Sequence, residues 1–283
     1  MVTPFDRDGR VDLEAGRRLA AYLIANGSHG IVISGSTGES ATITDPEAFE
    51  LMEVVRGEVG DEVMLVFGTG TNDTKHSVRL TEEAVENGAD AALVVTPYYN
   101  KPNPAGILAH FEAIADAAGD LPIIAYNIPS RVVVNIPPSL LAELAQIDNV
   151  VAVKQANNDE LQPIEGLAIL AGNDDIFLRT LEVDGGAGGI CVASHLVGPQ
   201  MREIWDAAQA GDLDHAREID AGLRQVYAAM GVTTNPIPLK AALEMTGLIP
   251  SGALRLPLVP ADTEQRATVR AALESVGLAP VTS

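Results

Sequence analysis

The feature that most constrains this chain is the regular return of short apolar runs, separated by stretches with helical spacing. The runs occupy residues 30–34, 63–68, 91–96, 122–127, 150–154, 167–172 and 189–193. They show little alternation of apolar and polar residues, as expected of parallel strands covered on both faces. Between them, apolar residues recur at helical spacing, as at Leu80, Ala84 and Val85, and Gly88 then ends the stretch. The pattern therefore predicts parallel strands that alternate with helices.

These seven units and a first strand at Val2, Thr3 and Pro4 would make eight. Eight β/α units favour a (β/α)8 TIM barrel over an open doubly wound sheet, and no strong dinucleotide fingerprint supports the open sheet. After Gly211 the pattern is purely helical, near 212–230, 236–246 and 262–276. We therefore expect an α/β protein with a barrel over 1–211 that carries the active site, and a helical appendage over 212–283.

Composition excludes several classes of function. The 283 residues carry a formal net charge of −21, which argues against nucleic acid and anionic membrane surfaces as partners. No apolar run approaches the roughly 20 residues of a membrane helix, and the start lacks a basic segment followed by an apolar one, so a cytoplasmic protein is predicted. Cys191, the single cysteine, lies between Ile190 and Val192 and is expected to be a buried structural thiol. The five histidines are scattered, so we expect no metal site, and no cofactor is predicted.

Lys154 ends the apolar, β-branched run 150–154. Burial disfavours the charged form of an ammonium, so a lysine at this place is expected to become a nucleophilic amine, as Schiff-base chemistry requires. The alternative is structural, because a lysine at a strand end can also reach water or pair with a carboxylate. The residues at the other strand ends help to decide between a nucleophilic and a structural Lys154.

Hydroxyl groups follow three of the expected strands. Ser36 and Thr37 lie in a glycine-rich turn that is suited to a small carboxylate, although such turns are often only structural. Tyr99 and Tyr126 follow or end two other strands, where a phenol can carry protons to and from an amine or can simply pack at the rim. Arg131 could hold a substrate carboxylate or be solvated surface charge.

The chain resembles the dihydrodipicolinate synthase and N-acetylneuraminate lyase family of pyruvate-dependent class I aldolases over nearly its full length. The segments that carry the resemblance are Gly-Ser-Thr-Gly-Glu at 35–39, Val-Thr-Pro-Tyr-Tyr-Asn at 95–100, Tyr-Asn-Ile-Pro at 126–129, Val-Ala-Val-Lys at 151–154 and Asn-Pro-Ile-Pro at 235–238. The resemblance implies that Lys154 forms a Schiff base with pyruvate, and that Tyr126, Ser36 and Tyr99 relay protons. It implies that Thr37 holds the pyruvate carboxylate and that the backbone of Ile190 lies near the keto acid. It also implies a homotetramer built from tight dimers, in which Tyr99 crosses into the neighbour's site.

Two features point to different branches of the family. Ser36 is similar to the lyases, whereas Arg131 is similar to the synthases, in which that arginine binds the carboxylate of L-aspartate 4-semialdehyde. Arg131 weighs more, because a serine keeps the hydroxyl that a relay needs, whereas losing a guanidinium would remove a charged contact with the substrate. The predicted reaction is condensation of pyruvate with this aldehyde to 4-hydroxy-tetrahydrodipicolinate, toward lysine and diaminopimelate. The alternatives are an N-acetylneuraminate lyase-like or other sugar-acid aldolase, and a non-catalytic barrel that binds a small acid.

The chain also departs from the family. Gln155 replaces an acidic residue that often follows the lysine, and the first strand lacks several residues, as if the native chain began upstream. Positions that bind inhibitory lysine in the synthases are here Asp45, Ala48 and His76, which do not match the sensitive pattern. We therefore expect weak or absent inhibition by lysine.

Overall fold

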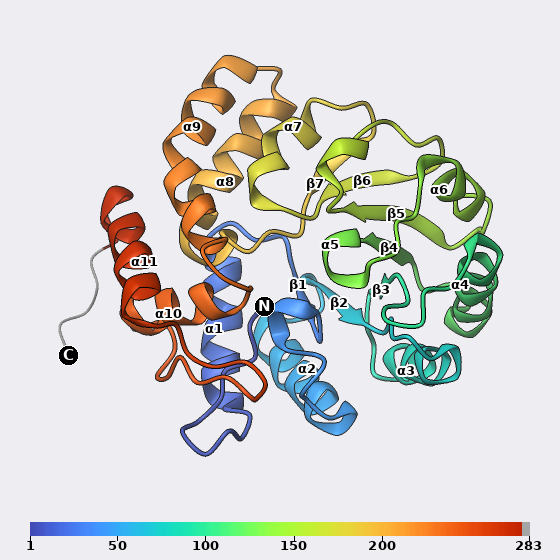
Figure 1. Ribbon diagram of the computed structural model, residues 1–283, viewed down its shortest axis with the longest axis horizontal. Coiled ribbons are helices and arrows are strands. Elements are labelled where there is room, and N and C mark those ends of the chain that lie inside the picture. Colours follow the sequence, from blue (N-terminus) through green and yellow to red (C-terminus); the bar gives the residue numbers. More distant parts are fainter. Residues whose placement is uncertain (279–283) are drawn as a thin grey trace. The chain divides into compact units, whose positions relative to one another are not determined.

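The computed structural model describes residues 1–278. The chain divides into two compact units (Figure 1). The first unit joins both ends of the chain, Met1–Val63 and Val192–Ser283, and the second is the continuous segment Met64–Cys191.

In the second unit, parallel strands alternate with helices. Its elements are β2 (Met64–Gly68), α3 (Thr74–Glu86), β3 (Ala91–Val95), α4 (Pro104–Ala118), β4 (Ile123–Asn127), α5 (Pro129–Val132), α6 (Pro138–Leu144), β5 (Val150–Gln155), the 3-10 helices Asn158–Glu160 and Asp174–Ile176, β6 (Ala168–Ala171), α7 (Phe177–Leu181) and β7 (Gly186–Gly189). Each strand from β2 to β7 pairs in parallel with the next one along the chain. The predicted alternation of parallel strands and helices is thus confirmed in this unit.

Burial explains why the strands lack period-two alternation. All five residues of β4 are buried, as are the first four of β3, so both faces of these strands are covered. Side-chain caps begin the helices beside them: Asp73 accepts a hydrogen bond from the backbone N–H of Lys75, and Asn103 accepts one from Gly106. The helices that follow the carboxyl ends of β2 and β3 therefore have well-defined starts.

The last strand of this unit lies earlier than the sequence predicted. The expected strand was 189–193, but β7 ends at Gly189. Its sequence, Gly-Ala-Gly-Gly, has no strand propensity of its own. The structure shows why glycine is needed: a Cβ on Gly186 would lie 1.8 Å from the carbonyl oxygen of Thr180.

The first unit is mainly helical. Its elements are α1 (Leu13–Ala25), β1 (Gly30–Ile33), the 3-10 helix Ser36–Gly38, α2 (Asp45–Val59), α8 (Ser194–Gln209), α9 (Leu213–Met230), α10 (Ile237–Met245) and α11 (Thr263–Ser275). The helical stretches expected after Gly211 correspond to α9, α10 and α11.

The predicted first strand is wrong, because Val2, Thr3 and Pro4 form no strand. The backbone N–H of Val2 donates to Nε2 of His195, and proline has no N–H to donate to a ladder. Phe5 instead forms an isolated antiparallel bridge with Val11. Side-chain and local contacts thus replace the expected strand pairing.

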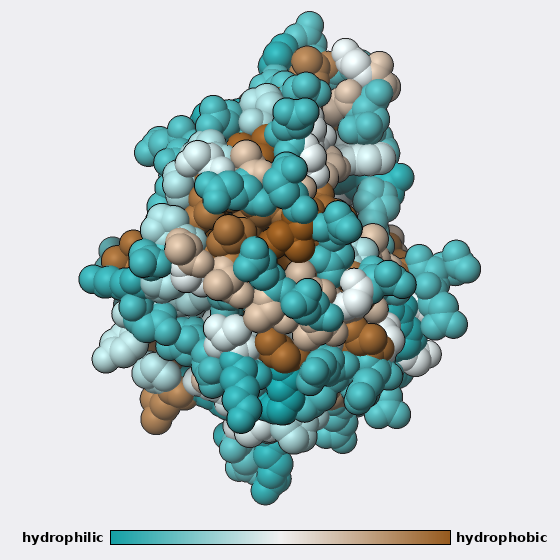
Figure 2. All heavy atoms as spheres, turned by 90° about the vertical axis from the view of Figure 1, so that its right-hand side faces the viewer, coloured by the Kyte–Doolittle hydropathy of each residue, from teal (hydrophilic) through white to brown (hydrophobic). Residues whose placement is uncertain are grey.

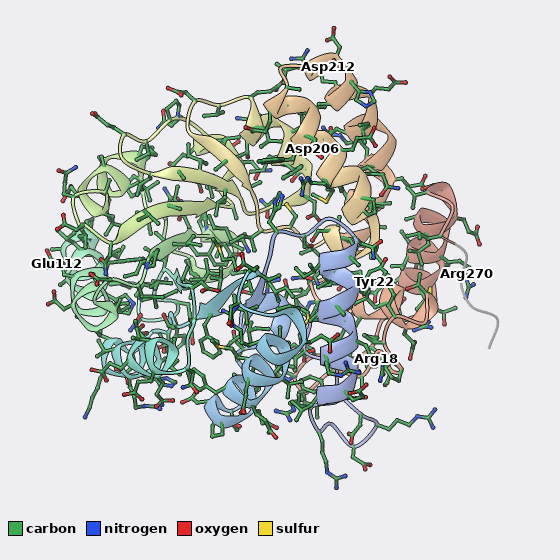
Figure 3. The ribbon with its side chains drawn as sticks, turned by 180° about the vertical axis from the view of Figure 1, so that it is seen from behind. Arg18, Tyr22, Glu112, Asp206, Asp212 and Arg270 are labelled. Atoms are coloured by element: carbon green, nitrogen blue, oxygen red, sulfur yellow. The ribbon has the colours of Figure 1, made fainter. Side chains whose placement is uncertain are left out.

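On the face shown in Figure 2, hydrophilic residues cover most of the surface, and hydrophobic residues gather mainly near its centre. Glu112 on α4 and Arg270 on α11 point outward from their helices (Figure 3).

Trp205, the only tryptophan, packs edge-on against His29 with 5.1 Å between ring centroids. Within residues 1–278, no helix combines the length and apolarity that crossing a bilayer requires.

Candidate active site

Lys154 and Tyr126 lie side by side on neighbouring strands. They are direct partners in the parallel register of β4 and β5. Nζ of Lys154 lies 4.2 Å from the centroid of the Tyr126 ring. Lys154 is 8% exposed and Tyr126 is 5% exposed. The structure therefore places an amine and a phenol, the two groups expected to carry Schiff-base chemistry, together in a buried environment.

The neighbouring strand on the other side of Tyr126, β3, is also tied to it. Thr96, directly after β3, donates hydrogen bonds to the carbonyl oxygen of Tyr126 from its backbone N–H (3.0 Å) and from Oγ1 (2.9 Å). These bonds extend the ladder beyond the last paired residues of the two strands. They hold the backbone at Tyr126 from the side opposite Lys154.

Cys191 is less buried than the sequence predicted, because part of its surface is exposed. It is the chain's single cysteine, and it follows β7 closely. Burial and the neighbouring Asp174 raise the pKa of the Cys191 thiol well above its usual range, although the charge of Lys154 opposes this. A protonated thiol is a poor nucleophile, so Cys191 is not a candidate for the attacking group.

Tyr99 is not brought to Lys154 within this chain. It lies in the segment after β3 with a φ of 74° and is 87% exposed. The neighbouring Asn100 is anchored, because its Nδ2 donates to the carbonyl oxygen of Asn72 at 2.7 Å. Tyr99 therefore projects from a fixed turn rather than packing against the buried Lys154 and Tyr126 pair.

Arg131 and Ile190 both follow strand ends in the same unit. Arg131 is an exposed residue of the short helix α5, which starts two residues after β4. Ile190 directly follows β7, and its N–H donates to the carbonyl oxygen of Ala171 on β6 at 2.9 Å. The hydrogen bond fixes the backbone of Ile190 relative to β6.

Ser36 and Thr37 belong to the other unit, in the 3-10 helix that follows β1. Both are partly exposed. Nδ2 of Asn235 donates to Oγ1 of Thr37 at 2.9 Å, and Oγ1 of Thr3 donates to the carbonyl oxygen of Gly38 at 2.7 Å. The turn is thus held from the helical tail and from the amino-terminal segment.

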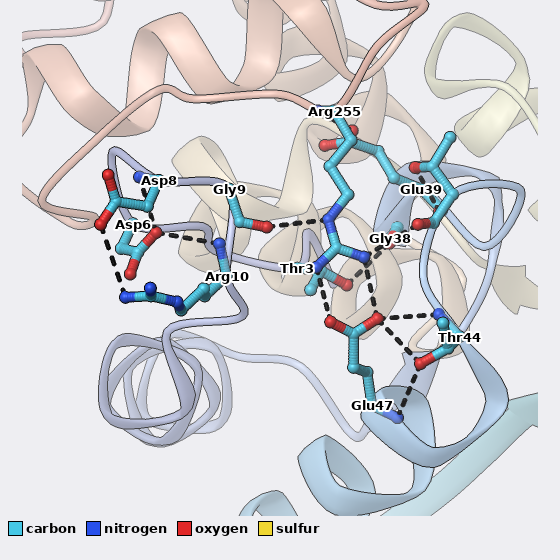
Figure 4. A network of polar contacts seen from close by, with 11 residues as sticks. Thr3, Asp6, Asp8, Gly9, Arg10, Gly38, Glu39, Thr44, Glu47 and Arg255 are labelled. Carbon is cyan, nitrogen blue, oxygen red and sulfur yellow. Dashed lines mark hydrogen bonds and ion pairs between the residues drawn. The ribbon is translucent and has the colours of Figure 1, made fainter.

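Behind this turn lies a buried charge network that the sequence alone did not predict. Glu39 ends the turn in the left-handed conformation, with φ 58°, and pairs with Lys240 of α10. Arg255 donates from its backbone N–H to the Glu39 carboxylate and from both terminal nitrogens to Glu47 (Figure 4). The only signal in the sequence was that both Glu39 and the segment 235–238 belong to the family's motifs.

Among the described residues, no group of three or more His, Cys, Asp and Glu side chains could hold a metal ion. An amine beside a phenol can add to a carbonyl and exchange the protons that the addition requires.

Comparison with known proteins agrees with this chemistry. A family model described as the dihydrodipicolinate synthetase family matches residues 1–276. The chain is 44% identical to a 4-hydroxy-tetrahydrodipicolinate synthase of Moorella thermoacetica, over 98% of this chain and 97% of that protein. It is 45% identical to the enzyme of the same name from Symbiobacterium thermophilum, over 98% and 96%.

Comparison with solved structures points to the same family. Dihydrodipicolinate synthase from Cyanidioschyzon merolae, described with lysine bound, matches with a TM-score of 0.94 at 37% identity, covering 98% of this chain and 96% of that one. The chloride-inhibited enzyme from Acinetobacter baumannii, complexed with pyruvate, matches with a TM-score of 0.93 at 34% identity, covering 98% and 97%. By sequence and by structure, the chain belongs to the dihydrodipicolinate synthetase family.

Proposed function

We propose that this chain is a 4-hydroxy-tetrahydrodipicolinate synthase, a lyase that condenses pyruvate with L-aspartate 4-semialdehyde on the path to lysine and diaminopimelate. The observation that carries the proposal is the buried contact of the Lys154 amine with the Tyr126 ring, at 4.2 Å. The names of the relatives reported above support the synthase branch, and a serine at Ser36 retains the hydroxyl that either branch requires.

Lys154 is the proposed nucleophile. Its amine adds to the C2 carbonyl of pyruvate, and loss of water from the carbinolamine gives an imine. Loss of a proton from C3 then gives an enamine, whose C3 bonds to the aldehyde carbon of the second substrate. The amino group of that substrate attacks the imine carbon, which closes the ring and releases the Lys154 amine.

The other residues have supporting roles in the proposal. Tyr126 exchanges protons with the carbinolamine, and Ser36 and Tyr99 complete the relay. Thr37 holds the pyruvate carboxylate, and the backbone of Ile190 lies near the keto acid. Arg131 binds the carboxylate of the aldehyde, and its exposed place on α5 supports contact with a substrate that enters from solvent.

The proposal extends to assembly and fold. Tyr99 is 87% exposed in the single chain, which supports its donation to the site of a second copy in a homotetramer built from dimers. The consecutive parallel strands β2 to β7 support a TIM barrel over 1–211 with a helical appendage over 212–283. A cytoplasmic enzyme is part of the same proposal, and analytical ultracentrifugation tests the assembly.

Weak inhibition by lysine is also proposed. Ala48 is 2% exposed, so its side chain offers a ligand almost no surface, and Asp45 occupies the first turn of α2. A titration of activity with lysine checks this, and half-inhibition at a physiological lysine concentration would contradict it.

The decisive experiment traps the imine. The chain has four lysines, Lys75, Lys101, Lys154 and Lys240. Incubation with pyruvate and borohydride, followed by peptide mass spectrometry, is expected to place one reduced adduct on Lys154. Lys101→Arg, at an exposed position, is the matched control and should keep the adduct, whereas Lys154→Arg should lose it. A folded wild-type protein with no adduct on Lys154 would overturn the proposed function.

The role of Arg131 needs a separate measurement. Arg131→Ala is expected to lower kcat/KM for L-aspartate 4-semialdehyde by about 100-fold while the pyruvate adduct on Lys154 survives. Unchanged turnover of the aldehyde would remove Arg131 from the site.

A further inference from the structure

A set of buried amides lies behind the Lys154 and Tyr126 pair. Asn127 and Gln155 directly follow Tyr126 and Lys154 and are partners in the same register of β4 and β5. Successive residues of a strand point to opposite faces, so the amides share the face away from the amine and the phenol. Nδ2 of Asn127 donates to Oε1 of Gln155 at 3.1 Å, and the two residues are 0% and 2% exposed.

Asn127 also closes the loop that carries Arg131. Its Oδ1 accepts from the backbone N–H of Ile136 at 3.0 Å, and its Nδ2 donates to the carbonyl oxygen of Ile136 at 3.3 Å and to Oδ1 of Asn135 at 2.9 Å. The segment 128–136 therefore leaves β4 at Asn127 and returns to the side chain of Asn127.

The network continues to the segment after β5. Oε1 of Gln155 accepts the backbone N–H of Asn157 at 2.9 Å, and Nδ2 of Asn157 donates to Oδ1 of Asn135 at 3.1 Å. Nδ2 of Asn135 donates to both carboxylate oxygens of Glu160, at 3.1 and 2.9 Å. We call Asn127, Asn135, Gln155 and Asn157 the amide clamp.

We propose that the amide clamp is a positioning device for the reaction, which sets the Arg131 loop relative to the Lys154 and Tyr126 pair. The inference rests on the proposed function, because it concerns the geometry between the imine-forming lysine and the residue that binds the aldehyde. None of the four clamp residues is assigned contact with a substrate. They act on the backbone of neighbouring segments: the side chain of Asn127 joins the loop to β4, and its hydrogen bond with Gln155 joins β4 to β5.

Moving the Arg131 loop away from the amide clamp would cost free energy. Buried amide groups must keep their hydrogen bonds, so a displaced loop would leave the polar atoms of Asn127 and Gln155 without partners. A loop held in this way is confined to one position relative to β4 and β5. Reacting groups misplaced by about 1 Å can cost up to about 100-fold in rate, so a small loosening of the clamp is measurable.

Gln155 gives the sharpest test because both of its described side-chain hydrogen bonds are accepted by Oε1. Gln155→Glu keeps an acceptor oxygen there, whereas Gln155→Met has similar length and no acceptor. We expect Gln155→Met to lower kcat/KM for the aldehyde by at least about tenfold per active site, and to change the rate of borohydride-trapped imine formation much less. Gln155→Glu should keep a clearly higher per-site kcat/KM than Gln155→Met, because it retains the acceptor, even if its buried carboxylate lowers the free energy of unfolding.

The number of active sites is counted by the trapped pyruvate adduct, so a lower folded fraction cannot imitate the effect. Asn149→Ala is the matched control, because Nδ2 of Asn149 also makes two hydrogen bonds, to the carbonyl oxygens of Ala115 and Gly119, but before the start of β5. It should leave the per-site kcat/KM for the aldehyde unchanged.

If Gln155→Met does not fold, Asn135→Ala replaces it, because Asn135 is only partly buried and still ties the loop to Asn127 and Asn157. A per-site kcat/KM equal to that of the wild type in the folded variant would overturn the positioning role and leave the clamp a purely structural feature. Absence of the adduct from the wild type would instead overturn the proposed function, so the two failures are distinguishable.

Discussion

Lys240 and Glu39 form an ion pair with almost no exposed surface: Nζ lies 2.5 Å from Oε1, and the two side chains are 0% and 1% exposed. Nζ of Lys240 also donates to the carbonyl oxygen of Ala253 at 2.9 Å and lies 4.0 Å from the centroid of the Phe5 ring. Burial lowers the pKa of Lys240, and the Glu39 carboxylate counteracts this. The pair joins the Ser36–Gly38 turn to α10 within the first unit.

Removing one partner of this pair should be strongly destabilising. Lys240→Met leaves the Glu39 carboxylate buried without its cation, which is expected to cost about 3 to 5 kcal/mol of unfolding free energy. The double variant Glu39→Gln with Lys240→Met should lose much less than the sum of the two single changes, because no charge remains buried. Urea denaturation measures all four proteins, and strictly additive losses would show that the two charges do not interact.

The contact of Glu47 with Arg255 predicts a loss of stability in acid. Hydrogen bonds from Arg255 lower the pKa of Glu47 to about 2. Because the folded carboxyl binds its proton less readily than the unfolded one, the contribution is fully present above about pH 4.5 and is lost as the pH falls toward 2. Glu47→Gln should therefore differ from the wild type at pH 7 and approach it near pH 2. Glu112→Gln, on the outward side of α4, is the control, and a difference that stays constant with pH would contradict the prediction.

His110 predicts a second, independent pH dependence. Burial lowers its pKa to about 4, and Nε2 has no hydrogen-bond partner among the described residues. The unfolded histidine takes up a proton first, so the wild type should lose stability as the pH falls from about 6.5 toward 4, by up to about 3 kcal/mol. His110→Gln should flatten this part of the curve, whereas the exposed His215→Gln should not. Equal slopes in wild type and His110→Gln would show that the ring does not titrate in this range.

A pair of glycines tests the packing of β7. Gly186→Ala places a Cβ against the carbonyl oxygen of Thr180, so we expect a loss of at least about 3 kcal/mol. Gly57→Ala, inside α2 with no atom within 4 Å of the new Cβ, should instead gain about 0.5 to 1 kcal/mol. Thermal unfolding of both variants measures the contrast, and a tolerated alanine at 186 would mean that β7 can move away from α7.

The fold was largely predictable because apolar runs and helical spacing are local properties of the sequence. The limits are also physical. The run at 189–193 misled because β7 is built from small residues, whose place is fixed by close backbone approach rather than by strand propensity. Val2 to Pro4 failed as a strand because a histidine far along the chain takes the Val2 N–H.

The candidate site was also predictable only in part. Lys154 and Tyr126 could be identified because each ends an apolar run, and parallel strands bring their carboxyl ends to one edge of the sheet. The residues that hold the site residues in place could not be predicted from the sequence in this way. Asn235 beside Thr37 and Lys240 beside Glu39 are long-range contacts without a periodic signal, and the amide clamp uses residues that look like ordinary loop amides.

The buried ion pair also has a consequence for synthesis of the chain. A ribosome releases Glu39 early and Lys240 late, whereas all of Met64–Cys191 appears in one uninterrupted stretch between them. The nascent first unit therefore holds a carboxylate that lacks its cation until α10 has emerged, while every strand from β2 to β7 is already available for pairing. Translation thus imposes an order on assembly: the second unit can form first, and the first unit is completed only after α10 has been made.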